Sequence, residues 1–566
     1  MRVPELIIEE QECSETYQDQ RPGTSGLRKR VETFSNGTYL HNFVQAIIDC
    51  IPDDPGSRQK PIIVSGDGRY FNKEASQIII AMLAANGFSH VIVGINFLLS
   101  TPAVSTIIRK FNAIGGIILT ASHNPGGPDG DFGVKYNVSN GGAAPDYLTE
   151  KIYERSKTLK SFKITKGFPI VDASKVAEFD YGGVKVEVVD GPSIHLSLLK
   201  TIFDFQAIKA FLHRTGFKIC YDGMSGVAGP TARKLFIEEF GLPESFVNRS
   251  IPLPDFGGAH PDPNLTYAPE LVQRMGLGPD ARKDDIPDFG AANDGDMDRN
   301  MILGKQFFVT PSDSLAIIAA HASVAIPYYA KNSLKGVARS MPTSCAVDRV
   351  AQKLGIPVYE VPTGWKYFCN LMDSGAIGIC GEESFGTGSD HIREKDGMWA
   401  VLAWLSIMEY NNRECRASVG DVVQRHWKQF GRNYYCRYDY ESVSSDDANK
   451  VFALLRQYIA KNTPEQFASF KLALADEFRY VDPVDGSVAD KQGVRFIFSD
   501  GSRIIYRLSG TGSVGATIRI YIERYEGRPE RTNEDPSVAL GPLIEIALAL
   551  SDIAKLTGRD SPTVIT

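Results

Sequence analysis

One pattern recurs three times along the 566-residue chain and restricts the fold more than any other feature. Each copy has a short apolar run, a loop rich in Gly, Asp or Ser, a helical pattern closed by Gly, and then a second β-prone run. From the first apolar run to the closing Gly, the copies cover residues 61–87, 216–241 and 336–355. Gly after the last periodic residue ends a helix, and strands joined through a helix are usually parallel. We therefore predict three related α/β domains with mixed, mainly parallel sheets.

The chain after about residue 428 follows a different pattern. Its alternating aromatic and apolar segments are NYYCRYDY, GVRFIFSD, RIIYRLSG and ATIRIYIE, with helical segments between and after them. This order is typical of a C-terminal α+β domain. We place the domain limits at 1–197, 198–310, 311–427 and 428–566.

Composition excludes several classes of protein. With 68 acidic and 61 basic side chains, the net charge of −7 argues against broad binding of nucleic acid or anionic membranes. Eight cysteines without a CxxC pair are typical of free thiols in a reducing compartment. No signal-peptide pattern is present, and the longest apolar stretch is interrupted by His321 and Pro327. We expect a soluble, cytoplasmic, monomeric protein without a membrane span.

The segment GGIILTASHNPGG brings Ser122 and His123 into a loop after a β-prone run. Ser122 is a candidate nucleophile at the end of a strand. A polar turn is the alternative, because adjacent Ser and His residues do not by themselves form a catalytic geometry. The chain has no GxSxG elbow, which disfavours a serine hydrolase.

The segment FGAANDGDMDRN places Asp294, Asp296 and Asp298 at alternate positions after an apolar run. In extended backbone, alternate side chains share one face. Three such carboxylates repel one another unless a cation lies among them, and oxygen ligands suit Mg²⁺. An EF-hand is excluded, because Arg299 and Lys305 occupy the positions that need Gly and a bidentate Glu. A solvated acidic turn remains the alternative.

Three further segments are candidates for ligand binding. GEESFGTGSDHIREKDG carries the carboxylates and hydroxyls that hold sugars. RLSGTGSVGATIR places Arg507 and Arg519 around a glycine-rich loop, which suits phosphate, although it contains no Walker A sequence. RPGTSGLRKRV is a local cationic patch near the N-terminus. A solvated loop, a glycine-rich hairpin and a basic surface turn are the respective alternatives.

Taken together, these motifs resemble the α-D-phosphohexomutase superfamily, and the match to its eukaryotic phosphoglucomutase branch covers nearly the whole chain. TASHNPGG, the Asp-Gly-Asp-x-Asp-Arg loop, GEESFGTGSDHIREKDG and RLSGTGS fall in the family's order, one in each predicted domain. The resemblance implies four domains around a central cleft. It also implies an intramolecular phosphotransferase of glucose metabolism that interconverts glucose 1-phosphate and glucose 6-phosphate. A phosphoserine enzyme and a glucose 1,6-bisphosphate intermediate, which is also the activator, would carry that reaction.

The resemblance also implies a role for individual residues. Ser122 would carry the phosphoryl group, and Mg²⁺ would bind it together with the three aspartates, Asp294, Asp296 and Asp298. The other catalytic residues would be His123, Lys395 and Arg28, with His123 and Lys395 as candidate general acid or base. The substrate-binding residues would be Thr24, Ser25, Arg28, Lys135, Arg299, Thr363, Gly364, Glu382, Ser384 and Lys395. The distal phosphate site would be formed by Arg507, Ser509, Thr511 and Arg519.

Three residues depart from the family's usual small side chains: Met297, Cys345 and Cys369. Met297 could alter the rate by changing the metal loop, but we expect activity to survive. Two alternatives stay open. One is a weakly active paralogue acting as a binding or signalling-associated protein, which the complete motif set disfavours. The other is a mutase for another hexose phosphate, which the GEESFGTGSD form of the sugar loop disfavours.

Overall fold

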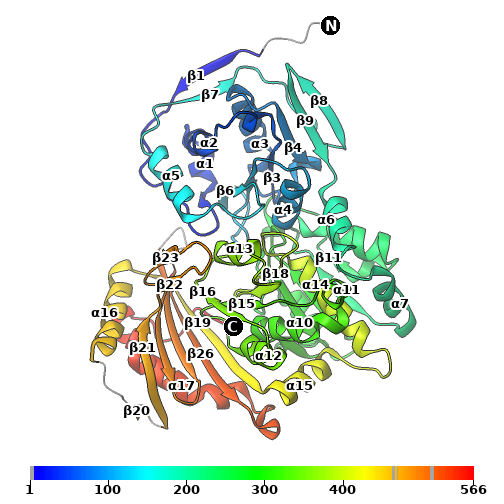
Figure 1. The fold of residues 1–566 in the computed structure, drawn as a ribbon, viewed down its shortest axis with the longest axis vertical. Helices are drawn as coiled ribbons and strands as arrows, with labels where there is room; N and C mark the ends of the chain where they lie inside the picture. Colours follow the sequence, from blue (N-terminus) through cyan, green and yellow to red (C-terminus); the bar gives the residue numbers. More distant parts are fainter. Residues whose placement is uncertain (1–5, 462–465, 468, 510–514) are drawn as a thin grey trace.

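The chain is organised around four large sheets. The computed structural model describes residues 6–461, 466–467, 469–509 and 515–566. Figure 1 shows the blue N-terminal unit at one end, the green middle of the chain in the centre, and the orange and red C-terminal unit beside it. Within the described ranges, none of the helices has both the length and the apolar character that crossing a membrane requires. All eight cysteines are free thiols, as predicted.

The first copy of the repeat forms the middle of a seven-stranded sheet, in the order β2-β6-β5-β3-β4-β9-β8. Strand β3 is buried along its whole length and pairs in parallel with β4 and β5, because helices connect these strands and cover the sheet. Strand β6 runs antiparallel to β5. The elements of this unit are β1 (Ile8–Glu12), β2 (Leu27–Arg30), α1 (Val31–Ser35), α2 (Tyr39–Cys50), β3 (Ile62–Gly66), α3 (Asn72–Ala85), β4 (His90–Gly94), α4 (Thr101–Lys110), β5 (Gly115–Leu119), β6 (Asp131–Val138), α5 (Asp146–Ser156), β7 (Ser161–Thr165), β8 (Ala177–Tyr181), β9 (Val184–Val189) and α6 (Gly191–Leu199).

The second unit repeats this path in a five-stranded sheet, β11-β10-β12-β13-β14. Strand β10 is parallel to β11 and β12, whereas β13 is antiparallel to β12. Part of its connecting helix is a π-helix over Arg233–Glu239. The elements are α7 (Phe205–Thr215), β10 (Ile219–Asp222), α8 (Ala228–Ala232), β11 (Val247–Asn248), α9 (Pro269–Arg274), β12 (Phe289–Asn293), β13 (Asn300–Gly304) and β14 (Phe307–Val309).

The third unit has the shortest version of the same sheet, β16-β15-β17-β18. Its repeat helix α12 ends at Gly355, whose backbone is left-handed (φ 66°), as the predicted stop signal requires. Its elements are α10 (Pro311–Ala325), α11 (Pro327–Asn332), β15 (Val337–Ser340), α12 (Ala346–Leu354), β16 (Val358–Val361), α13 (Lys366–Asp373), β17 (Ile379–Gly381), β18 (Thr387–Ser389), α14 (Gly397–Asn411) and α15 (Val419–Phe430).

The three candidate loops occupy the same place in these three related units. In each unit the last parallel strand leads through a loop into an antiparallel strand, β5 to β6, β12 to β13 and β17 to β18. The first connection carries Ser122, the second the three aspartates, and the third Glu382. The fold class is therefore confirmed, and the antiparallel strand that follows each loop is the feature that makes the sheets mixed.

Helix α14 joins the second and third units into one core. Every side chain from Gly397 to Met408 is buried, as expected for a helix that is apolar on all sides. The cluster around it includes Phe289 of the second sheet and Ile379 of the third. Because both sheets pack on the same helix, their site loops are held in a fixed relation to each other.

The C-terminal unit has a seven-stranded sheet, β20-β21-β24-β25-β26-β19-β27, as the alternating segments predicted. On β25 and β26, even-numbered residues such as Ile504 and Ile520 belong to the core beneath α16 and α17. Odd-numbered residues therefore point to the other face. The elements are β19 (Arg432–Val443), α16 (Ser445–Lys461), β20 (Gln466–Phe467), β21 (Phe470–Glu477), β22 (Tyr480–Val481), β23 (Val488–Ala489), β24 (Val494–Phe498), β25 (Arg503–Ser509), β26 (Ala516–Glu526), α17 (Pro536–Ser551), α18 (Ile553–Thr557) and β27 (Val564–Ile565).

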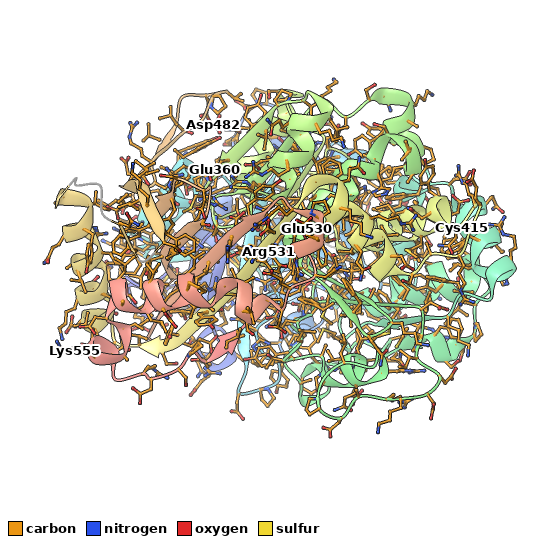
Figure 2. The ribbon with its side chains drawn as sticks, turned by 90° about the horizontal axis from the view of Figure 1, so that it is seen from below. Glu360, Cys415, Asp482, Glu530, Arg531 and Lys555 are labelled. Carbon is orange, nitrogen blue, oxygen red and sulfur yellow. The ribbon has the colours of Figure 1, made fainter. Side chains whose placement is uncertain are left out.

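Ion pairs connect the C-terminal unit to the third unit. Glu360 of β16, labelled in Figure 2, lies 2.9 Å from Arg339 of β15 and 2.9 Å from Arg495 of β24. Arg503 of β25 pairs with the same carboxylate at 3.4 Å. The polar face of the C-terminal sheet is thus turned toward the third unit.

Candidate active site

Ser122 lies three residues beyond β5 in a strained and well-anchored loop. Its backbone is left-handed (φ 53°), and its side chain is buried. Its N–H donates to Thr120 Oγ1 (2.7 Å), and its carbonyl accepts a hydrogen bond from Arg69 Nη2 (3.0 Å). Arg69 is itself buried and paired with Asp67 (2.9 Å). Non-glycine residues adopt this backbone conformation only when the surroundings enforce it, so the loop fixes the direction of the hydroxyl.

The Ser122 hydroxyl connects the first and second units. Its Oγ donates to Asp294 Oδ2 (2.9 Å) and lies 3.3 Å from His123 Nδ1. The two loops approach so closely that a Cβ on Gly295 would stand 2.8 Å from the Ser122 carbonyl oxygen. A glycine at this position therefore lets the aspartate loop reach the serine.

The three aspartates converge as predicted, although the predicted backbone is wrong. Strand β12 ends at Asn293 and β13 begins at Asn300, so Asp294, Asp296 and Asp298 lie in a turn and not along an extended strand. One carboxylate oxygen from each lies within 4.8 Å of the other two. Met297 has a left-handed backbone (φ 65°) and its side chain is buried in the core. The turn therefore directs the Met297 side chain into the core while the carboxylates meet.

This cluster has the properties of a cation site. Burial, followed by the neighbouring Asp296 and Asp298 carboxylates, raises the pKa of Asp294 well above its ordinary value. Asp296 Oδ1 and Asp298 Oδ1 are buried, and neither has a hydrogen-bond partner in the described structure. Three buried carboxylates, two of them with an unpartnered oxygen, fit a divalent cation bound by oxygen ligands.

Outer contacts hold these carboxylates in place. Thr101, at the start of α4, donates from Oγ1 to Asp296 Oδ2 (2.6 Å). Lys395 Nζ lies 2.9 Å from Asp298 Oδ2. The backbone N–H groups of Asp298 and Arg299 donate to Asp294 Oδ1. Contacts of this kind orient metal ligands and tune their affinity.

His123 and Lys395 differ in charge beside this cluster of aspartates. Burial, followed by the Arg299 and Arg28 guanidinium groups, lowers the pKa of His123 well below its ordinary value. Burial and then Arg299 oppose the charge of Lys395, but the carboxylates of Asp298, Glu382 and Asp294 together outweigh them and raise its pKa. At neutral pH, His123 is therefore an uncharged imidazole, and Lys395 is a charged donor.

The N-terminal loop contributes Thr24, Ser25 and Arg28. Thr24 is exposed and Ser25 is half-buried. Arg28 lies on β2, and its buried Nε has no hydrogen-bond partner among the described residues. Burial lowers the pKa of Arg28, whereas the Asp296 carboxylate acts in the opposite direction. The structure thus brings this cation to the aspartate loop from a distant part of the sequence.

Lys135 lies on β6 and forms a buried ion pair with Glu394. Asn137 of the same strand donates from Nδ2 to Glu394 Oε1 (2.8 Å). Arg299, directly before β13, pairs with Asp262 (3.2 Å). Lys135 therefore anchors the residue directly before Lys395.

The predicted sugar-binding residues lie together. The N–H of Gly364 donates to Glu382 Oε1 (2.9 Å), and burial raises the pKa of Glu382. Gly364 has a left-handed backbone (φ 126°), and a Cβ there would stand 3.4 Å from Thr24 Cγ2. Thr363 Oγ1 is buried without a described partner, and Ser384 is half-buried. Loops from the first and third units thus meet at one place.

The predicted distal residues lie on the polar face of the C-terminal sheet. Arg507 of β25 is directly opposite Arg519 of β26, which is opposite Asp439 of β19. Arg519 Nε lies 3.5 Å from Asp439 Oδ2. Ser509 is buried two residues beyond Arg507 on the same strand. Thr511 lies outside the described residues.

Family comparisons agree with this arrangement. Models described as phosphoglucomutase/phosphomannomutase alpha/beta/alpha domains I, II and III match residues 19–163, 195–306 and 311–430. A model described as the C-terminal domain of phosphoglucomutase-1 matches residues 432–563. A probable cytoplasmic phosphoglucomutase of Arabidopsis thaliana is 54% identical, with 97% of each chain covered. The chain belongs to the phosphoglucomutase/phosphomannomutase family.

Further members of the phosphoglucomutase/phosphomannomutase family support the same assignment. A cytoplasmic phosphoglucomutase of Populus tremula is 53% identical, with 97% of this chain and 98% of the relative covered. The open form of pp63/parafusin from Paramecium, an exocytosis-sensitive phosphoprotein and phosphoglucomutase, has a TM-score of 0.90 and 48% identity, with both chains fully covered. The resemblance and the fold class stated from the sequence are confirmed.

The structure adds residues that the sequence analysis missed. Arg437 is buried, and its Nε lies 2.9 Å from Asp439 Oδ1 beside the distal arginines. The alternation in NYYCRYDY was the available signal, because it places both residues on one face. Glu394 stood next to Lys395 in the charged segment. Thr101 had no local signal, since it lies 195 residues from its partner Asp296.

Proposed function

We propose that this family member interconverts glucose 1-phosphate and glucose 6-phosphate through a phosphorylated Ser122. The observation that carries the proposal is the hydrogen bond from Ser122 Oγ to Asp294, in a buried loop with two further carboxylates. Its relatives named phosphoglucomutase support the same reaction and substrates. Relatives named cytoplasmic also support a cytoplasmic enzyme.

The reaction consists of two transfers of opposite direction. In the first, the bond between phosphorus and Ser122 Oγ breaks, and a bond to the free sugar hydroxyl forms, giving glucose 1,6-bisphosphate. A base takes the proton of that hydroxyl. The bisphosphate then turns round, and its other phosphoryl group returns to Ser122, which leaves the isomeric monophosphate. No phosphate is gained or lost in the cycle.

The buried carboxylates fit a bound Mg²⁺, which Asp294, Asp296, Asp298 and the phosphate on Ser122 would hold. When bound, the ion would neutralise charge on the phosphoryl oxygens. Arg28 and Arg299 would bind further phosphoryl oxygens beside it. These cations explain how an acidic protein binds a phosphate group at this place.

Two neighbouring side chains are suited to proton transfer. His123 is 3.3 Å from Ser122 Oγ, and its lowered pKa leaves the imidazole able to accept a proton. Lys395 keeps its proton because of Asp298 and the neighbouring carboxylates, and it can donate that proton to a departing oxygen. Lys135 positions Lys395 through Glu394. We propose His123 as the base and Lys395 as the acid of the first transfer.

The remaining predicted residues would hold the sugar and its second phosphate. Thr24, Ser25, Thr363, Gly364, Glu382 and Ser384 would contact the sugar hydroxyls, and Arg507, Ser509, Thr511 and Arg519 the distal phosphate. Carboxylates accept hydrogen bonds from hydroxyls, whereas forked guanidinium groups match phosphate oxygens. A monomer suffices for this reaction, because one chain supplies all these groups.

The direct test is a coupled assay with purified protein, Mg²⁺ and catalytic glucose 1,6-bisphosphate. Glucose 1-phosphate should be converted to glucose 6-phosphate, and the reaction should stop when the metal is chelated. Mannose 1-phosphate and N-acetylglucosamine 1-phosphate should turn over far more slowly under the same conditions. Faster turnover of either one, or no conversion of glucose 1-phosphate, would contradict the proposal.

A further inference from the structure

Glu383 is a buried carboxylate that the proposed reaction leaves without a role. It lies in the loop after β17, between the two predicted sugar ligands, and is 3% exposed. Its N–H donates to Thr343 Oγ1 (2.9 Å), which fixes the backbone. Neither of its carboxylate oxygens has a hydrogen-bond partner in the described part of the chain. An unpaired buried carboxylate is costly, so other charges must compensate for it.

The compensating charges come from the C-terminal sheet. Burial opposes the charge of Arg437, but Asp439 and then Glu383 raise its pKa. Burial likewise opposes the charge of Arg507, whose pKa is raised by Tyr521 and then by Glu383. Hydrogen bonds hold the same sheet against the segment that fixes Glu383: Arg503 Nη2 donates to the Thr343 carbonyl (2.8 Å), and the Tyr435 hydroxyl donates to the Pro342 carbonyl (2.9 Å). The carboxylate therefore lies at the boundary between the third unit and the C-terminal unit, on the side of both guanidinium groups.

Sheet register confirms that these groups share one surface. Arg437 of β19 is opposite Tyr521 of β26, and Arg507 of β25 is opposite Arg519, two residues before Tyr521 on the same strand. Residues two apart on a strand point to the same face. This face carries the proposed distal phosphate site, so Glu383 lies beside that site, on the third unit.

We propose that Glu383 is a positioning residue that weakens the hold of Arg437 and Arg507 on the distal phosphate. This inference rests on the proposed function, in which the bisphosphate must release its distal phosphate and turn round between the two transfers. Three arginines alone would bind a phosphate dianion tightly and slow that release. A fixed carboxylate beside them repels the dianion and attracts the same guanidinium groups.

Binding without turnover tests this directly. In a Ser122→Ala background, glucose 6-phosphate affinity is measured by calorimetry with and without Glu383→Gln. Loss of one nearby charge should tighten binding at least about five-fold, because the interaction is only partly screened. Glu383→Asp keeps the charge and should stay within about two-fold of the Ser122→Ala protein. Equal or weaker binding by the Gln variant would overturn the proposal.

Steady-state kinetics distinguish a positioning role of Glu383 from a purely structural one. In the protein with Ser122 intact, Glu383→Gln should lower KM and kcat together, since tighter binding slows release of the bisphosphate. A fall in kcat with an unchanged or higher KM would indicate a packing defect and contradict the inference. The complex between the enzyme and glucose 1,6-bisphosphate should also dissociate measurably more slowly.

Two controls keep the result interpretable. If Glu383→Gln alone does not fold, Arg437→Gln is compared with Arg437→Gln/Glu383→Gln, in which one cation and one anion are removed together. Tighter glucose 6-phosphate binding by the double variant supports the proposal, and equal or weaker binding overturns it. If the wild-type protein converts no glucose 1-phosphate, the proposed function fails separately. The Glu383 comparison is then made with inorganic phosphate, and the same two outcomes apply.

Discussion

The aspartate loop around Asp294 and the arginine face around Arg507 both serve phosphate in the proposed reaction, but they are built in opposite ways. The first is a turn whose carboxylates are fixed by Thr101, Lys395 and backbone N–H groups. The second is a strand surface of the C-terminal sheet whose arginines are balanced by carboxylates such as Asp439, which lies 3.5 Å from Arg519. A transfer centre gains from rigid placement, because a small displacement of reacting groups slows reaction. A site that must bind and release in each cycle gains from balanced charge.

The sources of the two sites differ as well. The Ser122 hydroxyl and the aspartates come from equivalent loops of two related units, which share the order of four core strands, β4-β3-β5-β6 and β11-β10-β12-β13. The arginines come from antiparallel strands of an unrelated sheet. In the proposed reaction, the chain therefore combines a repeated scaffold for chemistry with a separate surface for binding. Substitutions in the serine and aspartate loops should therefore act mainly on kcat, and substitutions on the arginine face mainly on KM.

The largest effect is expected from Ser122→Ala. Without the hydroxyl no phosphoserine forms, and kcat should fall at least about 10³-fold. The coupled assay measures this loss, and mass spectrometry should no longer find a phosphorylated peptide at this position. Ser76→Ala removes another buried hydroxyl of the first unit and should keep normal turnover. Substantial turnover by Ser122→Ala would show that the aspartate loop serves some other chemistry.

Asp296→Asn should have the next largest effect. It replaces one of the three clustered carboxylates, and its Oδ1 has no hydrogen-bond partner among the described residues. Loss of that charge should lower kcat about a hundred-fold and raise the Mg²⁺ concentration needed for half-maximal activity. Asp313→Asn, a buried carboxylate in α10, is the matched control. Equal losses in both variants would mean that the defect is one of folding.

Arg507→Lys tests the arginine face of the C-terminal sheet. Lysine keeps the positive charge but loses the planar fork, so KM should rise about thirty-fold while kcat changes less. Arg524→Lys is the control, because Arg524 lies on β26 and donates to the Ala539 carbonyl in the helical layer (2.9 Å). The coupled assay separates the two parameters. A loss confined to kcat would place Arg507 among the groups that act in the transfer step.

Local sequence patterns predicted much of the fold. The repeated run–helix–Gly pattern gave three sets of parallel strands, and alternation gave the long C-terminal strands such as β19 and β26. The antiparallel direction of β6, β13 and β18 was not predicted, since a strand's residues do not encode its partner's direction. The π-helix of Arg233–Glu239 also had no recognised signal, because tertiary packing decides such distortions.

The candidate site shows the same limit. Motif residues such as Ser122 and the three aspartates were found because each motif is contiguous. Their convergence was predicted for the wrong backbone, since the turn after Asn293 depends on Met297 entering the core. Arg437 and Thr101 were missed because their roles depend on contacts between units. Sequence thus identified the candidate site residues that lie in contiguous motifs and missed the residues that contact them from other units.

Thr101→Val should give the smallest effect and the sharpest test of rigid placement. It removes the 2.6 Å hydrogen bond to Asp296 Oδ2 but leaves every proposed metal ligand and the side-chain volume in place. Removal of such an outer contact should weaken Mg²⁺ binding about ten-fold. Calorimetric titration of the metal into the substrate-free protein measures this change, and the metal dependence of the mutase assay should shift by the same factor. Thr106→Val is the matched control, because Thr106 lies on the same helix and donates to the Pro102 carbonyl (2.9 Å). If both variants bind Mg²⁺ as the wild type does, the aspartate turn keeps its geometry without Thr101, and the contrast with the arginine face rests on charge alone.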